Sequence, residues 1–386
     1  MALLDHTPIG PGRHHAELAQ GFAPTRAALP DAMHMPGYYY ASREIFDLEK
    51  EKIFMRDWLC MGRVEEIPES GDYMSFRVFE EPLAVVRNAE GRINAFSNIC
   101  RHRGAEVVVG AGRAESFRCP YHGWLYDLDG RLKHASFMDK SGKFDPQARM
   151  TPIRCETWAG WIFINFDDNA APLSRHTAGF EQDFGELRMQ DCGLAGKLEL
   201  EFACNWKLLV ENIVDIYHFG VLHPTTVGRN VSTTGDPVQP RPNGGYYLQF
   251  HTGTQTKSGK PLFGAMPWLE DKPSGYSVSG LLPPNFTLFA HRDDTHPIVT
   301  WPLAPDRTRI VIYTIMPWEF FSRPRFREKL ADYTATNRQI LEEDRAMIES
   351  LQKGVASRRF VPGPMSHFER GIHHIISSIH ERLFAV

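Results

Sequence analysis

Two short segments, each combining one cysteine with one histidine, constrain this chain more than any other feature. The first is Cys100-Arg-His102-Arg-Gly and the second is Cys119-Pro-Tyr-His122-Gly-Trp, and their glycine and proline residues favour tight loops. Zinc sites use the same ligand types, but zinc fingers usually pair cysteine with cysteine and histidine with histidine. Because each segment supplies one ligand of each kind, the pattern predicts a metal centre built from two matched loops.

This ligand set suits a [2Fe–2S] cluster in which one iron takes both thiolates and the other takes both imidazoles. The spacing C-x-H followed by C-x-x-H, with its Gly-Trp tail, closely resembles the Rieske motif. The resemblance implies that Cys100, His102, Cys119 and His122 hold the cluster. Two neutral imidazoles lower its net negative charge, so it accepts an electron at a higher potential than an all-cysteine cluster. Plain zinc binding and an ordinary place in a core are the alternatives.

Length and composition exclude several classes of protein. The 386 residues are enough for two domains, and 42% hydrophobic with 23% charged residues is an ordinary globular composition. A formal net charge of −4 gives no reason to expect nucleic acid or an anionic membrane as a partner. We find neither the run of about 18 apolar residues of a membrane helix nor a signal-peptide core. Six cysteines are too few for a disulfide scaffold, so we expect a reducing cytoplasm.

Hydrophobic periodicity divides the chain into three parts of α+β type. Residues 1–41, rich in proline, glycine, histidine and alanine, are expected to form an arm that packs on the catalytic domain. Residues 42–166 are predicted as a small all-β domain, opened by a helix over 42–56, with both cysteine–histidine loops at one tip. Residues 167–386 are predicted as a second domain of strands and helices. Its expected elements are a strand at 198–204, a helix at 206–219, strands between 244 and 317, and helices at 324–353 and 366–382.

A second group of metal-binding residue types lies in and just after the predicted helix 206–219. His223 precedes Pro224, which disfavours helical backbone there, and Gly220 offers an earlier stop, so the chain is expected to leave the helix and return His223 to the helix face. A polar face turned to water is the alternative interpretation of this helix. The polar residues that share the face, within about 60° of one another, are Glu211, Asn212, Asp215 and His218.

A carboxylate far along the chain completes this second group. Asp344 sits at the middle of an apolar stripe in the predicted helix 324–353, where an ionised side chain is costly unless it is paired or bound to metal. An ion pair with an arginine is the alternative. The stripe consists of Ile340, Leu341, Met347, Ile348 and Leu351. The residues predicted as surface charges on its flanks are Glu342, Glu343, Arg345 and Glu349.

Two imidazoles and one carboxylate form the facial triad of non-haem Fe(II) oxygenases, and His218, His223 and Asp344 supply that set. The segments 205–207, 211–223 and 343–354 resemble the iron motifs of the large catalytic subunit of Rieske non-haem iron oxygenases, the ring-hydroxylating dioxygenase family. The resemblance covers nearly the whole chain. It implies a Rieske domain followed by a helix-grip-like catalytic domain with an antiparallel sheet and flanking helices.

The resemblance further implies oxygenation of a small organic molecule with O₂ and two electrons at a mononuclear Fe(II) fed by the Rieske cluster. The chain has no Gly-x-Gly-x-x-Gly after a strand and no plant-type four-cysteine motif, so a separate reductase, with or without a ferredoxin, is expected to supply electrons from NAD(P)H. An electron carrier and a zinc-binding structural protein are the competing interpretations. About three irons per chain would indicate the oxygenase and about two the carrier.

The substrate and the assembly are also expectations from the resemblance. Ring-hydroxylating members carry aspartate at the position of Asp215, whereas some relatives acting on quaternary amines carry glutamate, so an aromatic substrate is expected. The alternative is a monooxygenase that removes N- or O-methyl groups or hydroxylates a non-aromatic amine. Arg292 could anchor a substrate carboxylate, although a paired surface arginine is the preferred interpretation. A homotrimer is implied, in which Asp215, with Asn212 beside it as a second catalytic residue, links His218 to a cluster histidine of another chain.

Overall fold

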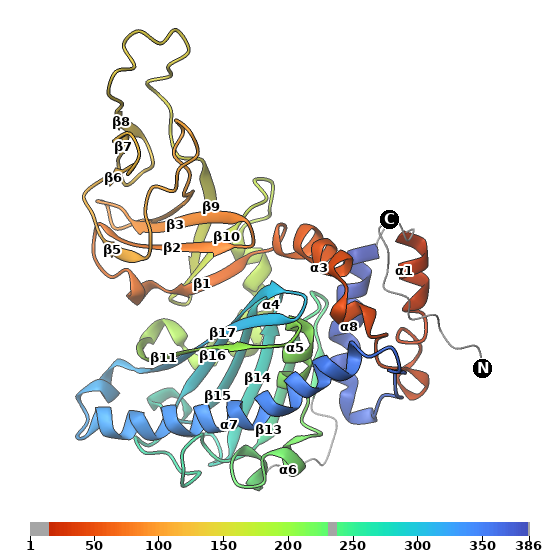
Figure 1. The fold of residues 1–386 in the computed structure, drawn as a ribbon. Coiled ribbons are helices and arrows are strands. Elements are labelled where there is room, and N and C mark those ends of the chain that lie inside the picture. The colour runs from red at the N-terminus through yellow and green to blue at the C-terminus, as the bar shows by residue number, and fades with distance from the viewer. Residues whose placement is uncertain (1–14, 231–237, 385–386) are drawn as a thin grey trace. The chain divides into compact units, whose positions relative to one another are not determined.

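The computed structural model describes residues 15–230 and 238–384, which form two compact units. The small unit is Met55–His176, and the large unit joins the described residues up to Phe54 with those from Thr177 onward. Strands build the small unit, and an antiparallel sheet with helices builds the large one (Figure 1), which confirms the predicted α+β class. In the described part of the chain, no helix combines the length and apolar character needed to cross a membrane.

The small unit contains a seven-stranded antiparallel sheet in the order β1-β10-β9-β4-β3-β2-β5, and a three-stranded sheet in the order β6-β7-β8. The core lies along β3 and β10, whose residues are almost all buried. The large sheet consists of β1 (Leu59–Arg63), β2 (Asp72–Val78), β3 (Glu81–Arg87), β4 (Ile93–Ser97), β5 (Ala111–Arg113), β9 (Pro152–Trp158) and β10 (Trp161–Asn165), and the small one of β6 (Phe117–Arg118), β7 (Leu125–Tyr126) and β8 (Leu132–His134).

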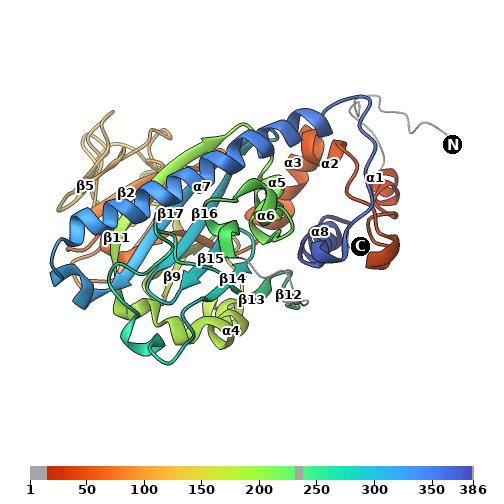
Figure 2. The same cartoon turned by 90° about the horizontal axis from the view of Figure 1, so that it is seen from below.

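The large unit is organised around a second seven-stranded antiparallel sheet, in which β12 to β17 follow one another and β11 pairs with β17. The long helix α7 (Phe326–Val355) runs across one face of this sheet (Figure 2), as expected for a helix-grip arrangement. The strands are β11 (Cys192–Phe202), β12 (Val238–Pro240), β13 (Tyr246–His251), β14 (Tyr276–Leu282), β15 (Phe286–His291), β16 (Thr295–Ala304) and β17 (Arg307–Pro317). The other helices are α1 (His15–Gly21), α2 (Tyr38–Ala41), α3 (Arg43–Glu49), α4 (Leu173–Phe184), α5 (Trp206–Val214), α6 (Phe219–Leu222) and α8 (Arg370–Phe384).

The predicted helix 206–219 ends five residues early, at Val214. Asn205 begins it as expected for a capping residue, because its side-chain oxygen accepts a hydrogen bond from the backbone of Lys207 at 3.0 Å. At the other end Asp215 adopts extended backbone, and its Oδ1 accepts the backbone N–H of Tyr217 at 2.7 Å. A short polar side chain that bonds the backbone two residues on competes with helix continuation, so the aspartate itself ends α5.

The domain boundaries differ from the predicted ones. The helix predicted to open the all-β domain comprises α3 and a π-helical turn to Phe54, and both belong to the large unit. Their anchor is Glu49, a fully buried carboxylate that accepts hydrogen bonds from Lys207 and, at 2.7 Å, from the indole of Trp206. A helix wheel cannot reveal that a buried glutamate finds its partners some 150 residues later. Of the predicted arm, residues 15–41 lie in the large unit, and residues 1–14 lie outside the described residues.

Candidate metal centres and active-site pocket

The two cysteine–histidine segments fold into loops with the same backbone hydrogen bonds. The carbonyl of Cys100 accepts the N–H of Gly104, and that of Cys119 accepts the N–H of Gly123, both at 3.0 Å. The two glycines adopt φ of +82° and +73°, a left-handed conformation that favours glycine. The matched glycine spacing of the sequence therefore produces two matched turns, each presenting one thiol and one imidazole.

The four side chains of these loops meet in pairs. Both thiols are buried and interact with each other, while the Nδ1 atoms of His102 and His122 lie 3.1 Å apart. One imidazole nitrogen facing another, beside a pair of thiols, is the donor chemistry that a two-iron cluster requires, so the residues present fit a Rieske centre. The ring of His102 also stacks on Trp124, with 5.0 Å between ring centroids, which holds the imidazole in position.

Tyr126 is a participant that the sequence pattern did not reveal. Its hydroxyl lies 3.3 Å from the sulfur of Cys100 and accepts the backbone N–H of Arg101 at 3.0 Å. Hydrogen bonds to the sulfur ligands tune the potential of an iron–sulfur centre. Tyr126 lies on β7, seven residues after Cys119, and reaches the first loop only because β7 folds back beside it.

Replacing Cys119 with serine should abolish the visible absorption and the EPR signal of the reduced cluster. A hard hydroxyl oxygen replaces the soft thiolate that an iron–sulfur centre needs. Cys155→Ser is the matched control, because Cys155 is a free, partly buried cysteine of the same unit. A Cys119→Ser protein with the normal Rieske spectrum would show that this ligand is misassigned.

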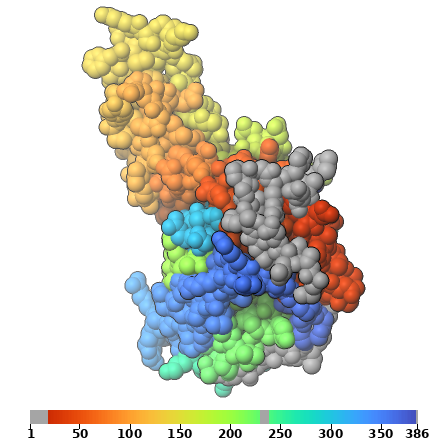
Figure 3. All heavy atoms as spheres, turned by 45° about the vertical axis from the view of Figure 1, so that its right-hand side comes forward, coloured from red at the N-terminus to blue at the C-terminus, as the bar shows by residue number. Residues whose placement is uncertain are grey.

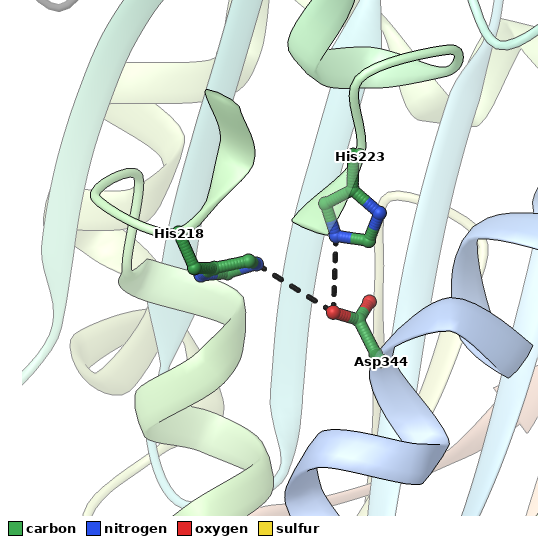
Figure 4. Close-up of side chains that lie close together, drawn as sticks. All are labelled: His218, His223 and Asp344. Carbon is green, nitrogen blue, oxygen red and sulfur yellow. Dashed lines mark hydrogen bonds and ion pairs between the residues drawn. The ribbon is translucent and has the colours of Figure 1, made fainter. Parts of the chain in front are cut away.

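His218, His223 and Asp344 converge in the large unit (Figure 4). His218 directly precedes α6 and His223 directly follows it, and Asp344 projects from the middle of α7. The Oδ1 atom of Asp344 lies 3.0 Å from Nε2 of His223 and 3.5 Å from Nε2 of His218. The three ligand atoms are all within 4.8 Å of one another. Two nitrogens and one oxygen in a largely buried position fit a mononuclear iron.

A carboxylate stands behind each of these two imidazoles. The Nδ1–H of His218 donates to Asp215 at 2.9 Å, and the Nδ1–H of His223 donates to Glu343 at 2.8 Å. Such partners fix the tautomer and leave Nε2 free for a metal. The prediction that Glu343 is an ordinary surface charge is therefore wrong. The segment after α6 covers that flank of α7, where Glu343 also accepts the hydroxyl of Thr226 at 2.9 Å.

The apolar stripe around Asp344 is narrower than predicted. Ile348 is buried, but Met347 and Leu351 are each about half exposed, at 48% and 52%. Asp344 is nevertheless buried, and it also accepts the side-chain amide of Asn212 at 3.2 Å. Asn212 thus orients the carboxylate, a contact that its place on the polar face did not predict. Helices α5 and α7 contact each other, and Figure 3 shows the blue atoms of α7 next to green atoms of the α5–α6 region.

The charges of the site are mutually dependent. Burial disfavours the imidazolium of His218, but its hydrogen bonds to Asp215 and Asp344 outweigh that effect and raise the pKa to about 9. Burial likewise opposes ionisation of Asp344, yet the two histidines lower its pKa below the usual value. The carboxylate therefore attracts positive charge between the rings, and a metal ion would replace protons in that role.

A pocket of about 800 Å³, its open mouth included, adjoins the triad in the large unit. Its wall is mostly apolar, and three of its aromatic rings form a row that begins at the triad. Phe219 lies 5.0 Å from the ring of His218, Phe250 follows at 6.4 Å from Phe219, and Phe289 lies 6.5 Å from Phe250, measured between centroids. Arg292 is not part of this wall, because its guanidinium donates to the backbone carbonyls of Leu269 and Glu270.

Comparisons with known proteins agree with this geometry. Residues 189–384 match the family model for the ring hydroxylating alpha subunit (catalytic domain), and residues 57–150 match the model for the Rieske [2Fe–2S] domain. The glycine betaine monooxygenase oxygenase subunit of Pseudomonas aeruginosa is 26% identical over 413 residues, covering 95% of this chain and 94% of that protein. The carnitine monooxygenase oxygenase subunit of Acinetobacter baumannii is 36% identical over 202 residues, or 51% of this chain. In that match the chain spans about half, 54%, of the relative's length.

Solved structures show the same fold. The quaternary ammonium Rieske monooxygenase CntA in complex with L-carnitine superposes with a TM-score of 0.75 at 25% identity, covering 92% of this chain and 97% of that one. Naphthalene 1,2-dioxygenase from Rhodococcus sp. with bound indole gives a TM-score of 0.76 at 19% identity, covering 96% and 98%. The second likeness concerns the fold alone. The sequence relatives favour the methylated-amine interpretation over the aromatic substrate expected from Asp215.

Proposed function

Since the chain belongs to the ring-hydroxylating alpha-subunit family of Rieske non-haem iron oxygenases, we propose that it is the oxygenase component of a monooxygenase for a small quaternary ammonium compound. The observation that carries the proposal is the row of Phe219, Phe250 and Phe289 that begins at the triad. Aromatic faces attract quaternary ammonium groups, which are cations with an apolar surface. A trimethylammonium group seated on these rings would bring a carbon attached to nitrogen near the triad.

The proposed reaction is hydroxylation of a carbon bonded to the ammonium nitrogen. The substrate, O₂, two electrons and two protons give the hydroxylated product and water. The carbon–nitrogen bond then breaks, releasing a carbonyl compound, a smaller amine and one proton. When bound, the mononuclear iron supplies O₂ activation with electrons that arrive through the cluster.

The residues of the chain prepare the site for that chemistry. Asp215 and Glu343 hold the Nδ1 protons of His218 and His223, so both Nε2 lone pairs point to one position. Asn212 donates to Asp344 and sets the direction of its carboxylate. The apolar wall excludes water from the bound substrate.

We further propose the partners and the assembly that the family resemblance implies. Electrons would come from a separate reductase, directly or through a ferredoxin. The assembly would be a homotrimer in which Asp215 connects His218 to His102 or His122 of a neighbouring chain. The hydrogen bond from His218 to Asp215 supports this route, because it supplies one half of the bridge.

The purified protein with a reductase should oxidise trimethylammonium compounds with O₂ uptake, while aromatic acids and hydrocarbons should give no hydroxylated product. Phe250→Leu should raise KM for a trimethylammonium substrate about ten- to thirtyfold, because one aromatic face is lost. Phe250→Leu should weaken the binding of a neutral analogue, in which tert-butyl replaces trimethylammonium, by less than threefold. That analogue reports only the loss of apolar packing. Aromatic cis-diols or phenols as the products, with methylated amines untouched, would overturn the proposal.

A further inference from the structure

A second histidine–carboxylate group lies in the hairpin between β15 and β16. His291, Asp294 and His296 are all buried, with exposures of 2%, 0% and 2%, and their ligand-type atoms lie within 4.8 Å of one another. His291 and His296 line the same pocket as the triad, whereas Asp294 stands behind them. Nδ1 of His291 lies 3.1 Å from one carboxylate oxygen of Asp294, and Nε2 of His296 lies 2.6 Å from the other. From the sequence, only Arg292 of this segment was a candidate site residue.

The hydrogen bonds of this group determine where its protons lie. Burial opposes ionisation of Asp294, but the two imidazoles hold the pKa of this carboxyl well below its usual value. Because an ionised carboxylate can only accept hydrogen bonds, both rings must donate to it. The other nitrogen of His296 faces the amide of Asn337 at 3.1 Å and the hydroxyl of Thr314 at 3.3 Å, so it accepts. His296 therefore has hydrogen-bond partners at both ring nitrogens.

His291 is left with one open position. Among the described residues its Nε2 has no hydrogen-bond partner, although the side chain is 98% buried and lines the pocket. A buried polar nitrogen is costly unless a ligand or water completes it. No lysine or arginine of the described chain lines the pocket, so outside the triad its potential cations are the imidazoles of His291 and His296, and of these His291 has the open nitrogen.

We propose that His291 Nε2 binds a carboxylate of the substrate, at the end of the molecule that does not face the triad. This inference rests on the proposed function and narrows it, because the substrate would then be a zwitterion with a quaternary ammonium and a carboxylate. With a carboxylate at Nε2 and Asp294 at Nδ1, the ring is satisfied by a proton on each nitrogen. Asp294 is the positioning residue that holds this ring.

Three other titratable groups of its own hairpin surround His291. On its own hairpin it faces Asp294, His296 and Asp293. Asp293 accepts hydrogen bonds from Thr254 and Tyr333, on the side away from the pocket. The adjacent strand β14 places the uncharged Ser277 opposite His291. Asp294 is thus the anion that directly contacts the ring.

The test compares 4-(trimethylammonio)butanoate with its primary amide and with butyltrimethylammonium, by calorimetry on the holoenzyme. The carboxylate should bind about tenfold to a hundredfold more tightly than the amide, the range for a charge-assisted hydrogen bond. His291→Phe should reduce that preference to within about twofold and leave butyltrimethylammonium binding within about threefold. His251→Phe, a change of an exposed histidine at the end of β13, is the matched control and should keep the preference.

The outcomes separate this inference from the proposed function. Equal binding of carboxylate and amide to the unmodified enzyme overturns the inference and leaves the ammonium proposal standing; this comparison needs no variant, so misfolding of His291→Phe cannot obscure it. A second outcome is that trimethylammonium ligands fail to bind, whereas aromatic carboxylates bind with the same dependence on His291. This result overturns the proposed function but supports His291 as the carboxylate-binding residue. A metal content that falls by one ion per chain in His291→Phe, with the triad occupied, means that the group is a metal site and overturns the inference.

Discussion

Replacing Asp344 with alanine should remove about one iron per chain and eliminate turnover, while the spectrum of the Rieske cluster stays unchanged. The carboxylate is the point at which His218, His223 and Asn212 meet, and without it two imidazoles alone remain to bind the metal. The cluster should survive because its ligands lie in the other compact unit. Metal analysis, visible spectroscopy and product formation measure the three parts of this result.

Glu342→Ala is the matched control for that experiment. Glu342 is the exposed neighbour of the Glu343–Asp344 pair on α7, and its carboxylate pairs with Arg345 rather than with the site. The control should retain iron and activity. An Asp344→Ala protein that keeps its full iron content and still oxygenates substrate would refute the assignment of this ligand.

The second large effect is expected for Asp215→Asn. The amide can still accept the backbone N–H of Tyr217, so the turn after α5 should persist, but it no longer places an anion at Nδ1 of His218. If Asp215 carries electrons between subunits, reoxidation of a chemically reduced cluster should slow about a hundredfold in a single turnover, with substrate and O₂ present. Loss of this carboxylate should weaken iron binding, so the comparison uses protein reloaded with Fe(II), in which both metal sites and the proposed trimer should persist.

Glu343→Gln distinguishes electron transfer from simple support of the metal site. It removes the equivalent carboxylate from the other imidazole, that of His223, and should weaken iron binding to a similar degree. With iron restored, its cluster should reoxidise at close to the normal rate, because Glu343 is not on the proposed route. Equal slowing in both variants, or full activity in a monomer, would rule out the bridge through Asp215.

The metal-ligand residues could be identified from the sequence because each motif extends over only a few residues. The glycines of the two cluster loops act within a few residues, so a pattern can reveal them. The predicted break between His218 and His223 is wrong, because α5 ends earlier, at Val214, and the helix α6 lies between the two histidines. The contact between Asp215 and His218 was predicted on the assumption of a continuous helix, but it forms across a turn that Asp215 itself creates. The residue pair was therefore right while the supporting geometry was not.

What the sequence could not reveal depends on distant segments. Glu343 appeared to be a surface charge because a helix wheel does not show the loop that covers it. His291 and His296 lie on different strands, and only the hairpin brings both to one carboxylate. The single residue Asp215 pointed to an aromatic substrate, whereas relatives of the chain are named as glycine betaine and carnitine monooxygenases.

Two adjacent carboxylates of α7 contact the two nitrogens of one imidazole. Glu343 lies 2.8 Å from Nδ1 of His223, and Asp344 lies 3.0 Å from Nε2. Successive helix residues point about 100° apart, so both contacts hold only at one azimuth of the helix about its axis. Both contacts of the His223 ring therefore depend on the rotation of α7 about its axis. Substitutions far along α7 that rotate the helix on the sheet by a small angle should weaken iron binding without touching any ligand.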